Sequence, residues 1–137
     1  MEGSISDVIN YIKNLEKFSD YPVAKFAPEH GHADIVAKKV KDKVKVTQLR
    51  KLFTQIKQIE LELKGKNSEE DFKATTKIYL LLPELAYALG RKLITPKYYN
   101  LMKECFDVKK LKRVKDFNRL VEFLTAVLAY HKKVIKN

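Results

Sequence analysis

Few residues in this 137-residue chain have the types and spacing that could support chemistry. The stretch HGHAD places His30 and His32 next to Asp34, and imidazole and carboxylate groups are ligands that Zn²⁺ uses in proteins. Two histidines two residues apart, without a third ligand at a recognisable spacing, are a weak metal signal. We therefore predict no metal and no other cofactor, and keep a nuclease built on these three residues as an alternative.

His131 and Cys105 are the other side chains with reactive potential. His131 ends the apolar stretch FLTAVLAYHKK, residues 123–133, where a core or interface histidine is a simpler interpretation than a catalytic one. Cys105 is the only cysteine, so it forms no internal disulfide and suits a reducing cytoplasm. The sequence has no glycine-rich phosphate loop, nucleophile elbow or zinc-binding spacing. We predict a protein that is not an enzyme.

Positive charge is the most informative property of the composition. The chain has 28 Lys and Arg residues against 17 Asp and Glu residues, a formal net charge of +11. Two blocks carry the excess: residues 31–64 and residues 91–137. Such asymmetry favours a polyanionic partner, either a nucleic acid or an anionic membrane surface. The competing interpretation is the lysine-rich, solvated surface of a thermophile's protein.

Basic side chains are therefore the candidate contacts to phosphate. Arginine can hold a phosphate through two parallel hydrogen bonds, whereas lysine acts as a point charge. We rank the arginines first, although each could equally be an ordinary solvated charge. The candidates are Lys45, Arg50, Lys51, Lys57, Arg91, Lys92, Lys110, Lys112, Arg113, Lys115 and Arg119.

Helices must position these side chains, because apolar residues recur every three to four positions along the chain. Ser4 or Ser6 is expected to cap the first helix. Thr47 is expected to cap the clearest helix, and Gly65 is expected to follow that helix in a left-handed conformation. The pair Thr95–Pro96 starts a further helix. Together with this helix, the spacing predicts helices over residues 4–18, 32–43, 47–64, 69–91 and 115–134.

The predicted fold is all-α, a small bundle of about five to six helices that forms one domain over residues 1–137. Residues 19–31 contain two prolines and a glycine and are expected to be a flexible loop after the first helix. Pro83 lies inside the pattern of residues 69–91 and predicts a kink or a break. No apolar run reaches the length of a membrane span, and the start of the chain has no signal peptide. We expect a cytoplasmic protein that does not bind a membrane.

Three stretches resemble a known family in their order and spacing. They are FAPEHGHADIVAKKVKDKVKVTQLRKLFTQIKQIE, PELAYALGRK and FLTAVLAYHKK, and they resemble the small subunit of type III-A CRISPR effector complexes, the Csm small subunit. The likeness covers roughly residues 25–137. Its most specific parts are TQLRK, AYALGR and AYHK, and the predicted first helix lies outside it.

This resemblance implies a helical subunit that acts in antiviral defence. It implies that several copies stack along a ribonucleoprotein and contact the backbone of crRNA and target RNA without reading sequence, while neighbouring Csm effector subunits cut the RNA. Partners would be crRNA, target RNA, those subunits and further copies of the chain. At the matching positions, Arg50, Lys51, Arg91 and Lys132 are the residues implied to face RNA or to anchor the structure.

A second function stays open on the residues alone. A helical DNA-binding protein or regulator needs a recognition helix that follows a short turn. The helix predicted over residues 47–64 could serve, although the loop before it has no turn glycine.

Overall fold

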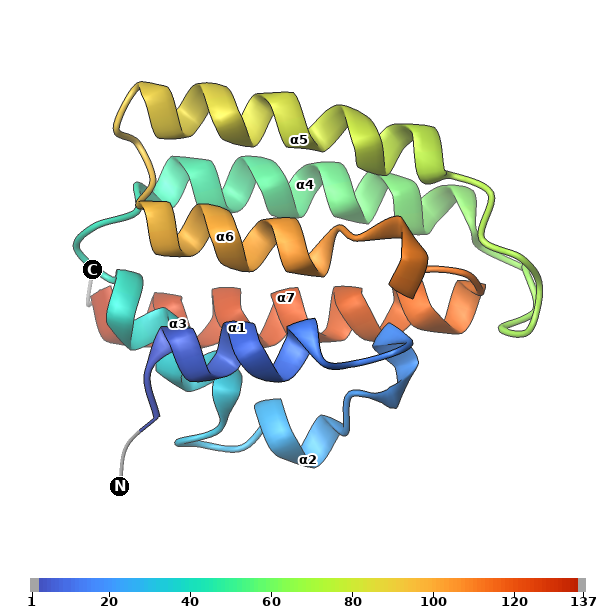
Figure 1. Cartoon of the computed structure of the whole chain (residues 1–137), viewed down its shortest axis with the longest axis horizontal. Helices are drawn as coiled ribbons and strands as arrows, with labels where there is room; N and C mark the ends of the chain where they lie inside the picture. Colours follow the sequence, from blue (N-terminus) through green and yellow to red (C-terminus); the bar gives the residue numbers. More distant parts are fainter. Residues whose placement is uncertain (1–2, 136–137) are drawn as a thin grey trace.

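The computed structural model describes residues 3–135, and this part of the chain is all-α, as predicted (Figure 1). The only strand-type pairing among these residues is an isolated bridge between Asp71 and Arg113. The elements are α1 (Ile5–Lys13), η1 (Phe18–Asp20), α2 (Val23–Phe26), α3 (His32–Val40), α4 (Val46–Glu62), α5 (Thr75–Gly90), α6 (Pro96–Cys105), η2 (Val108–Lys110) and α7 (Val114–Ile135), where η marks a 3₁₀ helix.

Helix α7 forms the centre of the bundle and packs against α3, α4 and η1. Helix α1 packs on α6 and α3, and α5 packs on α6 at the upper edge of the molecule in Figure 1. The inner face of α7 buries Phe117, Leu120, Phe123 and Leu124. Each such side chain contributes about 1.5–3 kcal/mol when it leaves water. Their burial explains the apolar stretch near the end of the sequence without a membrane.

Residues 19–31 contain two short helical segments where the sequence predicts a loop. Phe18, Tyr21 and Phe26 are buried, and the rings of Tyr21 and Phe26 lie 5.4 and 5.5 Å from the ring of Phe123. Aromatic contacts of this kind anchor the segment onto α7. The prolines and glycine mark the turns between the helical pieces, and the aromatic residues between them are core.

Helix α1 starts where predicted but ends earlier. Asp7 N donates to Ser4 Oγ over 3.1 Å, and Ser4 N donates to Asp7 Oδ2 over 3.0 Å, so Ser4 is the cap. The helix ends at Lys13, not at residue 18, because the chain turns there to bring Phe18 into the core. Lys110, a predicted phosphate contact, is buried and donates to Lys13 O over 3.1 Å. Its ammonium group satisfies the end of α1 and is not available to a ligand.

Helix α5 begins at Thr75, so the prediction of residue 69 was wrong. Residues 70–72 run instead beside the chain between α6 and α7: Phe72 N donates to Lys112 O over 2.8 Å, and Val114 N donates to Glu70 O over 2.9 Å. The extended path places Phe72 in the core, where its ring stacks on Phe117 at 4.9 Å. Tertiary packing thus overrides the local helical preference of this acidic segment.

Two further predictions concern helix interiors and ends. The α5 helix continues through Pro83 to Gly90, so a break at the proline is excluded. Helix α4 begins at Val46 with Lys45 at the cap position and no side-chain cap, so Thr47 is not the cap. Gly65 has a φ of +86°, the left-handed conformation expected of it. No helix in the described part of the chain is long and apolar enough to cross a membrane.

Candidate nucleic-acid interface

Two turns and one helix end lie at the same end of the molecule: the α3–α4 turn, the α5–α6 turn and the C-terminal end of α7 (Figure 1). The backbone ties two of them together, since Lys45 N donates to Leu93 O over 3.1 Å. The two basic blocks of the sequence therefore converge here. We call this region the cationic end and define it by Lys39, Lys41, Lys43, Lys45, Arg50, Arg91, Lys92, Lys97, Lys132 and Lys133.

A broad hollow of about 660 Å³ lies between the end of α3 and the end of α7. Five lysines line it, with Asp42 as the only acidic residue and Val134 as the apolar one. The sequence analysis named none of these lysines as a contact, although the basic run KKVKDKVK over residues 38–45 was a readable signal. The lining lysines are Lys38, Lys39, Lys41, Lys43 and Lys133.

A second pocket, of about 330 Å³, brings together two of the predicted contacts. Arg50 of α4 and Lys132 of α7 both line it, so the motifs TQLRK and YHK meet in space. Both side chains are exposed. The N-terminal end of α4 begins beside them without a side-chain cap, and its uncompensated N–H groups and helix dipole add positive potential. This arrangement favours an anion.

Arg91 and Lys92 complete the cationic end at the exit of α5. The guanidinium of Arg91 stacks over the Tyr87 ring, 5.7 Å from its centre, and Nη1 donates to Tyr87 Oη over 3.0 Å. Lys92 has a φ of +61° and closes the helix, with Leu93 N donating to Ala88 O over 2.9 Å. The left-handed turn that usually takes glycine thus falls on a lysine and points the chain back toward α6.

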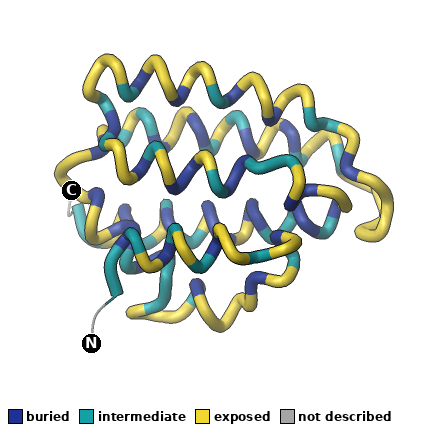
Figure 2. Tube along the Cα trace, viewed as in Figure 1, coloured by how far each residue is buried: buried dark blue, intermediate teal, exposed yellow. Residues whose placement is uncertain are grey.

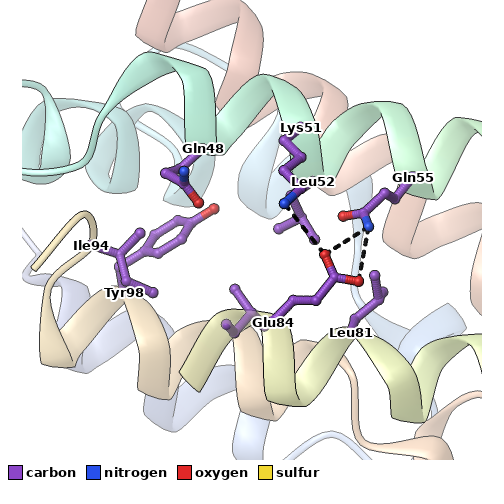
Figure 3. Close-up of a pocket in the computed structure, with 9 residues that line it drawn as sticks. Gln48, Lys51, Leu52, Gln55, Leu81, Glu84, Ile94 and Tyr98 are labelled. Atoms are coloured by element: carbon purple, nitrogen blue, oxygen red, sulfur yellow. Dashed lines mark hydrogen bonds and ion pairs between the residues drawn. The ribbon is translucent and has the colours of Figure 1, made fainter. Parts of the chain in front are cut away.

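Lys51 and Lys57 lie further along α4, and both have acidic partners. Lys51 Nζ is 3.6 Å from Glu84 Oε1, and Gln55 donates to the same carboxylate over 3.0 Å (Figure 3). These contacts join α4 to α5 above Leu52 and Leu81. Lys57 pairs with Glu60 one turn away. Exposed pairs of this kind contribute little and leave the cations only partly neutralised.

The remaining predicted contacts lie at the opposite end of the bundle, where carboxylates accompany them. Arg113 Nη1 is 3.0 Å from Asp71, and Lys115 Nζ is 3.1 Å from Glu69. Arg119 donates to Glu122 over 2.8 Å and to the Ser19 carbonyl over 3.2 Å, so it holds η1 against α7. Lys112 is exposed beside them. The structure therefore does not bring these residues together with Arg50 and Lys132.

The HGHAD stretch supports the start of α3. His32 Nδ1 lies 2.6 Å from Tyr21 Oη, and burial lowers the pKa of His32, with Lys25 adding to the effect. Asp34 accepts from His30 N over 2.8 Å and pairs with Lys38 over 3.4 Å. Within residues 3–135 no group of three His, Cys, Asp or Glu side chains is placed to hold a metal ion.

The other two reactive side chains are buried. Cys105 is fully enclosed, and burial raises the pKa of its thiol far above the ordinary value. His131 is 1% exposed, and neither ring nitrogen has a hydrogen-bond partner of good geometry among the described residues. Burial lowers the pKa of His131, and the Lys41 backbone opposes this shift. Both residues belong to the core.

The fold and the charge distribution define a class: a small, basic, all-α protein with a cluster of exposed cations at one end. The family model described as Csm2 Type III-A matches residues 24–137, and the chain belongs to this family of type III-A CRISPR small subunits. Membership implies a place in a multisubunit Csm complex. No curated protein and no solved structure was found to match the chain. Helix α1 lies outside the matched range.

Proposed function

We propose that the protein is a non-catalytic subunit of a cytoplasmic type III-A effector that acts in antiviral defence. In this role it contacts the sugar-phosphate backbone of crRNA and target RNA through the cationic end and stacks with neighbouring subunits. Cleavage of RNA belongs to companion subunits of the complex.

The observation that carries the proposal is the convergence of unpaired cations. Arg50, Arg91 and Lys132 come from segments far apart in the sequence, have no acidic partner among the described residues, and lie at the same end as the lysine-lined hollow. A row of such groups suits the regular spacing of phosphates and carries no base-specific information. The paired cations of the opposite end support the fold and contribute less to RNA binding.

The experiment uses the assembled complex, because one subunit alone contributes only part of the binding surface. Replacing Arg50 and Lys132 by alanine is expected to weaken binding of target RNA. It is also expected to reduce the slope of log affinity against log salt by about one for each phosphate that is no longer neutralised. Binding is measured by bandshift between about 50 and 200 mM salt, the range over which phosphate-dominated binding weakens steeply.

The matched control replaces Arg113 and Lys115 by alanine, which removes the same charge from the ion-paired end. This control is expected to keep the wild-type slope. Equal slopes for the wild-type complex and for the Arg50→Ala/Lys132→Ala variant would contradict the proposal, as would an equal decrease in the control.

The alternative function is that of a DNA-binding regulator, and it can be tested with the same purified protein. The α3–α4 pair joins two helices through residues 41–45, and α4 presents Arg50 and Thr54 to solvent. A regulator would select a defined duplex sequence from a random pool, whereas the proposed subunit selects none.

A further inference from the structure

The outer face of α5 carries no charge, in a chain whose residues are 33% charged. All of its residues are exposed, with Tyr79 at 56%, Leu80 at 61% and Tyr87 at 65% (Figure 2). The opposite face of the helix is buried against the bundle. A helix with apolar residues on two opposite faces normally has a partner on each. We define the α5 outer face as Thr76, Tyr79, Leu80, Pro83, Ala86, Tyr87 and Gly90.

The residues of this face are arranged symmetrically about Pro83. Tyr79 precedes it by four positions and Tyr87 follows it by four; Leu80 and Ala86 lie three positions away on either side. On a helix of 3.6 residues per turn, Pro83 therefore lies at the middle of the face with one tyrosine on each flank. A two-fold axis through Pro83 places each Tyr79 opposite Tyr87 of the second copy.

We infer that the α5 outer face binds a second copy of the chain, with the two α5 helices antiparallel and the two-fold axis at Pro83. This contact goes beyond the proposed stacking, because a two-fold interface closes on itself, whereas stacking adds subunits without limit. None of the residues of this face is among those that define the cationic end.

Charge favours a second copy in the antiparallel orientation. Each chain carries a net charge of +11, so a parallel pair would bring two cationic ends together, whereas the antiparallel pair separates them by the length of α5, about 24 Å for 16 residues. Opposed helix dipoles add to this preference.

Packing favours the same arrangement. The smallest residues of the face, Ala86 and Gly90, leave room for the two backbones to approach, and no atom lies within 4 Å of a Cβ built at Gly90. The Tyr87 ring is already held by Arg91, so little rotamer freedom remains to be lost when it meets Tyr79 of the second copy.

The first test measures the association of the full chain by sedimentation equilibrium. The wild type is expected to form a concentration-dependent dimer, and Leu80→Lys and Tyr87→Glu are each expected to raise its dissociation constant at least about tenfold. Val23→Lys is the matched control: Val23 is an exposed apolar residue, 41% exposed, on α2 at the other side of the bundle (Figure 1). Circular-dichroism melting of each variant checks that it folds.

The second test determines the register of the two α5 helices by oxidative cross-linking of introduced cysteines. The native Cys105 is buried and is not expected to cross-link. Pro83→Cys is expected to cross-link with itself, since position 83 lies on the axis. Tyr79→Cys and Tyr87→Cys are expected to cross-link when mixed and to cross-link far less when alone. Val23→Cys reports the background of random collisions.

Three outcomes would each overturn the inference. They are a wild-type chain that stays monomeric at all concentrations, a dimer that persists in Tyr87→Glu, and cross-linking of the Pro83→Cys variant no better than that of Val23→Cys. Failure of the inference is distinguishable from failure of the proposed function. Arg50→Ala/Lys132→Ala is expected to bind RNA more weakly in the complex and to keep the dimer, while Leu80→Lys, about three turns of α5 away from Arg91, weakens the dimer and keeps the salt slope of RNA binding.

Discussion

Two buried polar side chains of α7 differ in how they are satisfied. Asp116 accepts from Ser19 N, Lys112 N and Arg113 N over 2.9–3.1 Å, so its carboxylate organises the chain before α7 and joins it to η1. His131 has no comparable partner in the described chain. A buried imidazole in this position is held neutral, because the charged form would lose its hydration without a replacement.

Acid is therefore expected to weaken the fold. Burial lowers the pKa of His131 and of His32 in the folded chain, so the unfolded chain binds more protons just below pH 6.5, the ordinary histidine pKa. Their stabilising contribution is complete above that pH and is lost as pH falls toward the folded pKa values. Urea unfolding between about pH 7.5 and 5.5, above the range where carboxylates titrate, measures the slope.

His131→Leu is expected to flatten this pH dependence, because it removes one of the two imidazoles whose pKa is lowered by burial. A wild-type chain whose stability is constant or rises on acidification would show that the buried imidazoles are not the cause.

At the scale of single residues, the sequence identified the candidate cations but could not predict which of them have acidic partners. Arg50 and Arg113 look alike in the sequence, yet Arg113 meets Asp71, 42 residues away, and Arg50 meets no carboxylate of the described residues. Pairing over such separations depends on how the helices fold back, and no local pattern contains it.

Helix α5 contains the least favourable backbone position among the described helices. Pro83 lies in its interior, where it cannot donate to the carbonyl of Tyr79 and crowds the preceding turn. Pro83→Ala is therefore expected to stabilise the folded chain by about 1–3 kcal/mol, measured as a higher Tm.

Pro96→Ala is the matched control, because Pro96 is the first residue of α6, where a proline costs nothing. It is expected to leave Tm unchanged or slightly lower. A lower Tm for Pro83→Ala would mean that the proline fits a distortion that α5 requires.

Element types were predictable wherever periodicity was long, as in α4 and α7. Boundaries failed where a tertiary contact decided them. The acidic run Glu69–Asp71 has the composition of a first helical turn, and the helix nevertheless starts six residues later because Phe72 fills a space beside Phe117. The N-terminal cap Ser4 was predictable, since its partner Asp7 is three residues away.

At the scale of the whole molecule, α1 belongs to the same hydrophobic core as the helices that the family model covers. Ile5, Val8 and Ile12 are buried between α6 and α3. Ile12→Ala is expected to destabilise the fold by about 2–5 kcal/mol, since it leaves a cavity at a fully buried position.

Asn10→Ala, at an exposed position of the same helix, is expected to change stability by less than about 0.5 kcal/mol. Chemical unfolding of both variants measures the difference. A change below about 1 kcal/mol in Ile12→Ala would indicate that α1 is only loosely attached.

The composition predicted a basic all-α bundle with a polyanionic partner, and the fold adds where the charge is concentrated. Each of the two basic blocks contains many cations. Only the cations near the α3–α4 turn, the exit of α5 and the end of α7 lie together with few carboxylates beside them in the described chain. Which parts of two sequence blocks become neighbours depends on the path of the chain between them, and that path was set by buried residues such as Phe18 and Phe72.

The turn around Gly65 is a suitable site for inserting a foreign sequence. Residues 64–68 are exposed, a side chain at Gly65 would meet no atom within 4 Å, and the turn lies at the end of the bundle away from Arg50 and Lys132 (Figure 1). Exposed turns of this kind accept insertions readily. A purification handle or a fluorescent domain placed there would let whole assemblies be isolated or imaged while the cationic end and both chain termini are left untouched.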